Sequence, residues 1–225
     1  MIHAALLGLA LTAAGAPGLY FEQTTVVRKA GVATGPGVRS RVWHAARRLR
    51  LEAGDAPGGP ALVLRLDEGR ALRLDPEERV AVELDPSRLR ARAHQDASVA
   101  ASLMGGDEVT LRKAALEGQR TIAGHVCRGF RLRSGETAVD VWVAEDLPAG
   151  AGLFADFLEW SGAAQALGPL LAAIRELPGF PLETRVRVSV LGETQETVAT
   201  VTAIRVGPQP AERFEVPAGW RLERE

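Results

Sequence analysis

Apolar and polar residues alternate along much of this chain, and an alternation of period two is typical of β-strands. The alternation is clearest in two arms, at 125–133 and 136–144, which flank Ser134 and Gly135. A small polar residue followed by glycine, between two alternating runs, indicates a tight turn. The pattern therefore predicts a β-hairpin from about 125 to 144.

Similar short runs, separated by turns rich in Gly, Pro and Asp, recur along the chain. They lie at 20–29, 38–52, 61–66, 70–74, 80–84, 108–115, 119–133, 136–144, 185–190 and 198–206. This spacing is typical of an antiparallel meander and not of βαβ units. We therefore predict a mainly β fold with helical insertions, in which about ten strands form a curved antiparallel sheet or half-open β-barrel.

Two segments have helical features instead. Asp85 and Pro86 are suited to the first positions of a helix, which would end at Gly105. The second segment, 150–177, is rich in apolar residues and ends before Pro178. Because two helices cannot cover a flat sheet of ten strands, we predict that they plug the concave face of a curved one.

Most strands combine an aliphatic face with an arginine-bearing face, as where Leu49 and Leu51 alternate with Arg48 and Arg50. A sheet of this kind is wet on one side and apolar on the other. We predict that the aliphatic side is concave and contacts a hydrophobic ligand. The residues expected there are Leu49, Leu51, Leu62, Leu64, Leu72, Leu74, Val80, Val82, Phe130, Leu132, Val139, Val141, Val186 and Val188.

The aromatic side chains of the second helical segment allow two interpretations. In one, helices and side chains fill the concave side and form an ordinary core. In the other, the segment is a mobile lid over an apolar cavity that accepts a lipid chain. The expected lid residues are Phe154, Phe157, Leu158, Trp160, Leu170 and Ile174.

The first residues of the chain are uncharged and apolar. Residues 2–16 contain no Asp, Glu, Lys or Arg, and they end in Ala14-Gly15-Ala16, which is similar to a signal-peptidase site. We expect residues 1–16 to be a signal peptide, 17–225 to form one domain, and the protein to be periplasmic or secreted. The alternative is an uncleaved anchor of barely spanning length, but its Ala and Gly content argues against a stable transmembrane helix.

Composition narrows the possible partners. The formal net charge of -1 argues against a nucleic-acid partner held by bulk charge. The single cysteine, Cys127, excludes an intramolecular disulfide, and the four histidines lack zinc-site spacing, so we expect no metal and no cofactor. Arginine outnumbers lysine 25 to 2, which indicates either a coding bias or an arginine-rich binding face.

No catalytic motif is visible in the sequence. There is no G-x-S-x-G and no phosphate-binding loop, and acidic pairs such as Glu77-Glu78 lie in expected turns. His125 and Cys127 share a strand face but lie two residues apart, too far for a direct contact between nucleophile and base. We therefore expect no catalytic residues and no enzymatic activity.

Several short pieces of the chain together resemble a family of secreted bacterial proteins known only as a domain of unknown function. The pieces are RRLRLE (47–52), LVLRLDEGRALRLDP (62–76), IAGHVCRGFRL (122–132), VDVWVAEDLP (139–148), ELPGFPLET (176–184) and FEVPAGW (214–220). They extend the resemblance from about residue 19 to the end. That family is in turn similar in architecture to outer-membrane lipoprotein carriers of the LolA/LolB type, which implies a half-open barrel, a helical lid and an acyl-chain cavity.

Two functions follow from the pattern and the resemblance. The first is an extracytoplasmic protein that binds a lipid, another hydrophobic ligand or a lipidated partner in the half-barrel. The second is an envelope module with a filled core that contacts a protein partner through its arginine face or an edge strand. An enzyme would need a polar cleft with perturbed titrating groups, and nothing in the sequence indicates one.

Overall fold

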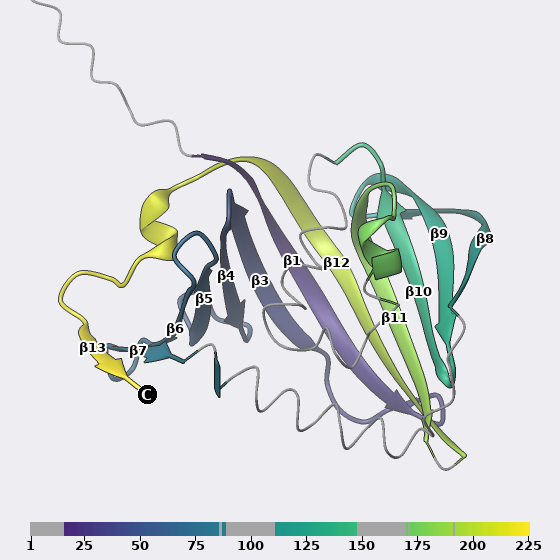
Figure 1. Cartoon of the computed structure of the whole chain (residues 1–225), viewed down its shortest axis with the longest axis horizontal. Coiled ribbons are helices and arrows are strands. Elements are labelled where there is room, and N and C mark those ends of the chain that lie inside the picture. The colour runs from purple at the N-terminus through teal and green to yellow at the C-terminus, as the bar shows by residue number, and fades with distance from the viewer. Residues whose placement is uncertain (1–15, 86, 89–110, 148–169, 171, 191) are drawn as a thin grey trace, which may run out of the picture.

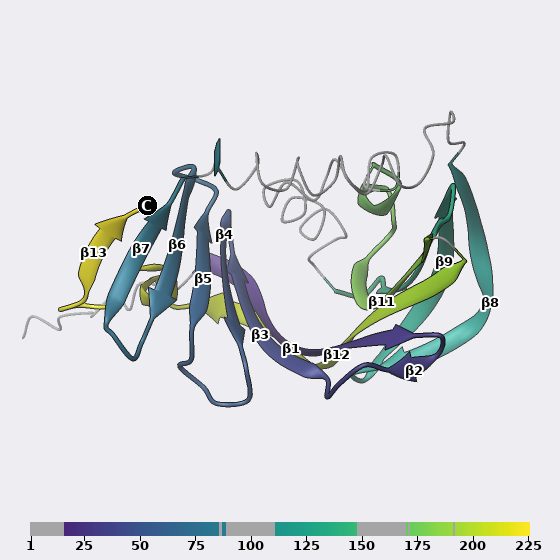
Figure 2. The ribbon, with the colours of Figure 1, turned by 90° about the horizontal axis from the view of Figure 1, so that it is seen from below.

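The computed structural model describes residues 16–85, 87–88, 111–147, 170, 172–190 and 192–225. Within these residues the chain forms one curved sheet of 13 strands (Figures 1 and 2). The strands are β1 (Ala16–Lys29), β2 (Val32–Ala33), β3 (Val38–Ala45), β4 (Arg48–Ala53), β5 (Ala61–Arg65), β6 (Arg70–Asp75), β7 (Val80–Leu84), β8 (Arg112–Ile122), β9 (His125–Ser134), β10 (Thr137–Ala144), β11 (Phe180–Val190), β12 (Glu193–Gln209) and β13 (Arg221–Arg224).

The two longest strands form the middle of the sheet and join two wings. The order is β13-β7-β6-β5-β4-β3-β1-β12-β11-β10-β9-β8, and β2 also pairs with β1. β1 and β12 are antiparallel along their whole shared length, from Ala16 opposite Gln209 to Lys29 opposite Gln195. All pairings are antiparallel except that of β13 with β7. The strands β3–β7 and β8–β11 therefore form the two sides of the sheet, with β1 and β12 between them. Figure 2 shows that the sheet is concave as a result.

The prediction of a mainly β, curved antiparallel sheet is confirmed, but the expected number of about ten strands is wrong. The run at 38–52 is two strands, because Ala46 adopts a left-handed conformation (φ 52°) in the turn between them. β2 is too short to show any period. β13 is polar and exposed, so its sequence carries no alternation signal.

The hairpin around 125–144 is confirmed, with its turn displaced by one residue. Ser134 pairs with Thr137, so the two loop residues are Gly135 and Glu136. Gly135 has a φ of 56°, which a residue without a Cβ adopts at little cost. This shift leaves the faces of both arms as predicted, because Val139 lies opposite Leu132 and Val141 opposite Phe130.

Helical residues cover part of the concave face. Leu170 and residues 172–175 are helical, and Leu170 and Ile174 are each 2% exposed and pack against the apolar side of β9 and β10. These residues belong to the predicted helical segment 150–177, and the plugging of the concave face by helices stays a prediction. Most of the two expected helical segments lies outside the described residues, including the predicted lid residues Phe154, Phe157, Leu158 and Trp160. Residues 1–15 of the expected signal peptide also lie outside them.

The convex face is not solvent-exposed throughout, because the C-terminal part of the chain covers the wing that contains β4 and β5. The 3-10 helix η1 (Ala211–Phe214) packs on β4 and β5. Its Phe214 is 1% exposed, in a cluster with Trp43 and Val63. Leu72 and Leu74 belong to this convex cluster, so their predicted place on the concave face is wrong. The reason is the loop between β5 and β6, which leaves Val63 and not Leu64 opposite Leu72.

Candidate functional site

An apolar groove of about 210 Å³ lies on the concave face, across the middle of the sheet. It extends over β4, β3, β1, β12 and β11. Its lining consists of Phe21, Gln23, Val42, Leu49, Leu51, Phe180, Pro181, Thr184, Val186, Thr197, Ala199 and Val201. None of these side chains is ionisable, so the groove offers a ligand an apolar surface with a few neutral hydrogen-bonding groups.

Small side chains on β12 create the hollow. The register places Thr197, Ala199 and Val201 on the concave face, opposite alternate residues of β1. The wings on either side carry larger residues that pack into two separate clusters. Phe21 and Phe180 close one end of the groove in an edge-to-face contact, with ring centroids 5.4 Å apart. The groove therefore lies where the sheet has the least side-chain volume.

A second hollow, of about 600 Å³, continues the groove toward the β11–β12 turn. The two share Val186 and Thr197, so they are contiguous. The second is more polar, and Lys29 and Glu193 are among its lining residues. The concave face thus combines an apolar interior with a charged mouth, which is the chemistry of a site for a chain with a polar end.

The predicted concave residues fall into four groups. Leu49, Leu51 and Val186 line the groove, and Val188 lines its mouth. Others share the concave face without lining it, namely Leu62, Leu64, Val80 and Val82 in one wing. Phe130, Leu132, Val139 and Val141 are buried under Leu170 and Ile174. Leu72 and Leu74 lie on the opposite face.

Sequence reasoning missed most of the groove floor. The missed residues are Phe21, Gln23, Val42, Phe180, Pro181, Thr184, Thr197, Ala199 and Val201. The run Thr197-Val198-Ala199-Thr200-Val201 has no clear apolar face, because Val198 points to the convex side while Ala199 points into the groove. The length of β12, which has 17 residues, was a signal that could have been used. A long strand rich in small residues is suited to the middle of a strongly curved sheet.

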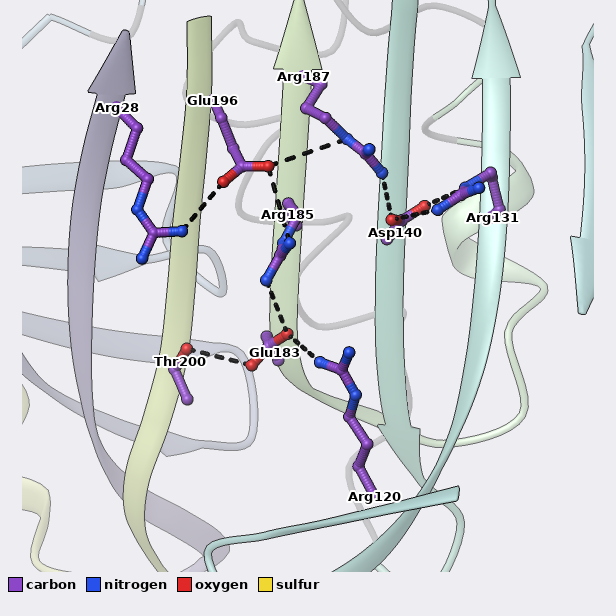
Figure 3. A network of polar contacts seen from close by, with 9 residues as sticks. All are labelled: Arg28, Arg120, Arg131, Asp140, Glu183, Arg185, Arg187, Glu196 and Thr200. Carbon is purple, nitrogen blue, oxygen red and sulfur yellow. Dashed lines mark hydrogen bonds and ion pairs between the residues drawn. The ribbon is translucent and has the colours of Figure 1, made fainter. Parts of the chain in front are cut away.

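The opposite, convex face of β1 and β8–β12 carries a network of ion pairs (Figure 3). Five arginines share three carboxylates. Asp140 accepts two hydrogen bonds from Arg131, at 2.6 and 2.7 Å, and one from Arg187. The other pairs are Arg28–Glu196 (3.2 Å), Arg185–Glu196 (3.8 Å), Arg187–Glu196 (4.0 Å), Arg120–Glu183 (2.9 Å) and Arg185–Glu183 (3.9 Å).

Asp140 is the most enclosed member of this network, at 6% exposure. Burial raises the pKa of its carboxyl, but the hydrogen bonds from Arg131 and the charge of Arg187 outweigh burial, and the pKa lies below its usual range. The Nε atoms of Arg185 and Arg187 are buried without a hydrogen-bond partner. The network therefore has more cationic donors than its own carboxylates satisfy.

The structure offers little support for chemistry at His125 and Cys127. The His125 ring contacts Asp146 (Nδ1–Oδ2 2.8 Å), whereas the Cys127 thiol contacts the His125 carbonyl at 3.5 Å. Burial raises the pKa of the Cys127 thiol above its usual range, which disfavours the nucleophilic thiolate. Among the described residues there is no group of His, Cys, Asp and Glu that could hold a metal ion. No helix in the described part of the chain is long and apolar enough to cross a membrane.

The chain matches a known protein family. A family described as "Domain of unknown function (DUF4412)" matches residues 87–220, more than half of the chain. The match includes FEVPAGW, whereas the pieces at 47–52 and 62–76, which we expected to belong to the resemblance, lie outside it. No curated protein matches the chain.

Many solved structures are similar to this chain at low identity, among them the following three. PNGF-II is 12% identical with a TM-score of 0.40, over 92% of this chain but 31% of its own. MucB in complex with MucA(peri) is 15% identical with a TM-score of 0.45, over 91% and 56%. A proposed outer membrane lipoprotein-sorting protein domain from Vibrio parahaemolyticus is 7% identical with a TM-score of 0.32, over 87% and 88%. With TM-scores below 0.5, these likenesses support no conclusion about function, and the similarity to LolA/LolB carriers stays a prediction.

Proposed function

Since this chain belongs to the DUF4412 family, a domain of unknown function, we propose a function from its geometry: it binds an apolar chain, such as the acyl chain of a lipid or a lipidated partner, in the concave groove. The main support for the proposal is that the side chains lining the groove are apolar or neutral across all five strands. A filled core would instead have large side chains at these positions.

The groove is suited to one narrow, flexible ligand. Its volume of about 210 Å³ is below the range of about 300–1,000 Å³ that is usual for drug-sized ligands. Each methylene of an acyl chain buried here contributes about 0.8 kcal/mol, so eight contribute roughly 6 kcal/mol before the cost of association. The contiguous polar mouth at Lys29 gives the head group of an amphiphile access to water.

Export belongs to the same proposal. The apolar, uncharged segment 2–16 supports a periplasmic or secreted protein. In that location the protein would meet lipids and lipidated proteins of the envelope, which are suitable ligands for such a groove.

Native mass spectrometry tests the proposal. The chain is expressed from its own N-terminus, purified without detergent and weighed before and after solvent extraction. Ala199→Phe fills the groove floor, and Ala114→Phe is the matched control, because Ala114 is exposed and lies opposite the convex residue Arg131. We expect a mass excess on the wild type and on Ala114→Phe that leaves as lipid and is absent from Ala199→Phe. A bare mass for the wild type, or equal lipid on both variants, would count against the groove.

A second candidate function is the docking of an acidic protein on the convex face, and the excess of arginines over carboxylates there favours it. Arg112 and Arg133 extend this surface and lie directly opposite each other, which is unfavourable for like charges. Reversal of both to Glu should weaken the binding of an acidic peptide such as poly-glutamate, while Arg39→Glu, an exposed position on β3, should not. An equal effect of all three reversals would indicate bulk charge only.

A further inference from the structure

A separate cavity of about 430 Å³ opens on the convex face, beside the first residues of β1 and the last residues of β12. It forms where the chain leaves β12 and turns back as η1, which Figure 1 shows as the yellow turn beyond the end of β12. Its lining residues are Tyr20, Trp43, Arg205, Val206, Gly207, Pro208, Gln209 and Arg213. It shares no residue with the concave groove.

Two guanidinium groups in this cavity are held by aromatic rings. The Arg205 guanidinium lies 5.6 Å from the Tyr20 ring centroid, and that of Arg213 lies 5.1 Å from the Trp43 ring centroid. The two rings pack on each other with centroids 5.0 Å apart. Cation–π contacts orient a guanidinium while leaving available the N–H donors, which point outward in the plane of the guanidinium itself. The cavity thus presents two oriented cationic groups.

Neither guanidinium forms an ion pair with any described carboxylate. The nearby carboxylate Glu22 accepts a hydrogen bond from the Tyr20 hydroxyl at 2.6 Å. Arginines close by on the same face are paired, as Arg65 with Glu215 (2.7 Å) and Arg50 with Glu52 (2.8 Å). Two unpaired like charges that face one cavity repel each other, and an anion between them would remove this repulsion.

We propose that this cavity binds a phosphate group through Arg205 and Arg213. Two unpaired guanidiniums match the charge of a phosphate, which is about −1.5 to −2 at neutral pH. Guanidinium N–H donors match phosphate oxygens in geometry and form charge-assisted, bidentate hydrogen bonds with them. Free phosphate and the phosphodiester head group of an anionic phospholipid, which carries a single negative charge, both present anionic phosphate oxygens to these donors.

Calorimetric titration of the full chain with inorganic phosphate, and sedimentation with phosphatidylglycerol vesicles, test the proposal and distinguish the two sources. Arg205→Gln and Arg213→Gln each remove one guanidinium, and Arg39→Gln is the control, because Arg39 is exposed on the same face of β3 as Trp43 but does not line the cavity. Thermal unfolding of each variant confirms that it is folded.

We expect saturable binding that each cavity variant weakens about tenfold or more, while Arg39→Gln leaves it unchanged. A response to inorganic phosphate would identify free phosphate as a sufficient ligand. A response to phosphatidylglycerol vesicles alone, with the same dependence on both arginines, would identify a lipid head group. The proposal is overturned if neither probe binds, if the cavity variants bind like the wild type, or if Arg39→Gln weakens binding equally.

Discussion

Replacement of Asp140 by Asn tests whether the convex network stabilises the sheet. Asp140 lies between β9 and β11 and accepts hydrogen bonds from both Arg131 and Arg187. Asn keeps the shape of the side chain but removes the charge that balances these two guanidiniums. Because its partners are on neighbouring strands, the loss acts on the pairing of three strands at once.

The expected loss lies between two limits. Breaking a buried ion pair costs about 3–5 kcal/mol, whereas an exposed pair contributes at most about 1 kcal/mol. The Asp140 side chain is 9% exposed, but those of Arg131 and Arg187 are 33% and 32% exposed, so water compensates part of the loss. We therefore expect Asp140→Asn to lower the free energy of unfolding by about 2–3 kcal/mol at pH 7.

The pH dependence of this effect has a defined sign. The pKa of Asp140 is lowered in the fold, so its stabilising contribution is complete above the unfolded carboxyl pKa of about 3.9 and is lost as pH falls through the folded value. Urea unfolding from pH 7 to pH 3 should show a constant difference between wild type and variant down to about pH 4, and a smaller one below. Asp55→Asn, at an exposed loop position, should change stability by less than about 0.5 kcal/mol. Equal stability of wild type and Asp140→Asn at pH 7 would show that the convex network does not stabilise the sheet.

Three further outcomes follow from the packing. Phe214→Ala should lower the free energy of unfolding by about 3–5 kcal/mol in urea titrations, because this side chain is 1% exposed under the C-terminal turn, while Leu222→Ala, at a side chain that is 48% exposed, should change it little. Gly179→Ala should lower the thermal unfolding temperature, since a Cβ there would lie 2.5 Å from the Ala144 carbonyl oxygen and the φ is 147°; an unchanged temperature would contradict this geometry. Cys127 should react with a thiol reagent only on unfolding, because it is fully buried and its pKa is raised by burial, and rapid labelling of the folded protein would refute this.

The sequence predicted faces correctly where aliphatic residues occupy only one side of neighbouring strands. In the 125–144 hairpin, alternation alone assigned Phe130, Leu132, Val139 and Val141 to one side, and they pack in one cluster. The other side of the second arm is also buried, but it carries the polar Asp140. The assignment failed at Leu72 and Leu74, because the sheet is buried on both faces in that wing. Strand alternation cannot show which of two apolar surfaces a residue contacts when a distant segment, here the one that carries Phe214, covers the second surface.

The groove itself could be predicted only in outline. Leu49, Leu51 and Val186 were expected in it because they are large and aliphatic. The residues that create the space, such as Ala199 and Thr197, are small. A search for alternating large apolar side chains therefore does not identify them. The convex cavity was missed for a similar reason, because Arg205 and Arg213 come together through the turn after β12 and not through any local motif.

Photo-crosslinking of the wild-type chain with a diazirine analogue of palmitic acid, followed by peptide mass spectrometry, would show which face of the sheet contacts an acyl chain. We expect adducts on concave residues such as Leu49, Val186 and Ala199, all of which unlabelled palmitate should suppress. Adducts on the convex cluster around Phe214, or adducts that competition with palmitate does not reduce, would contradict a ligand groove on the concave face.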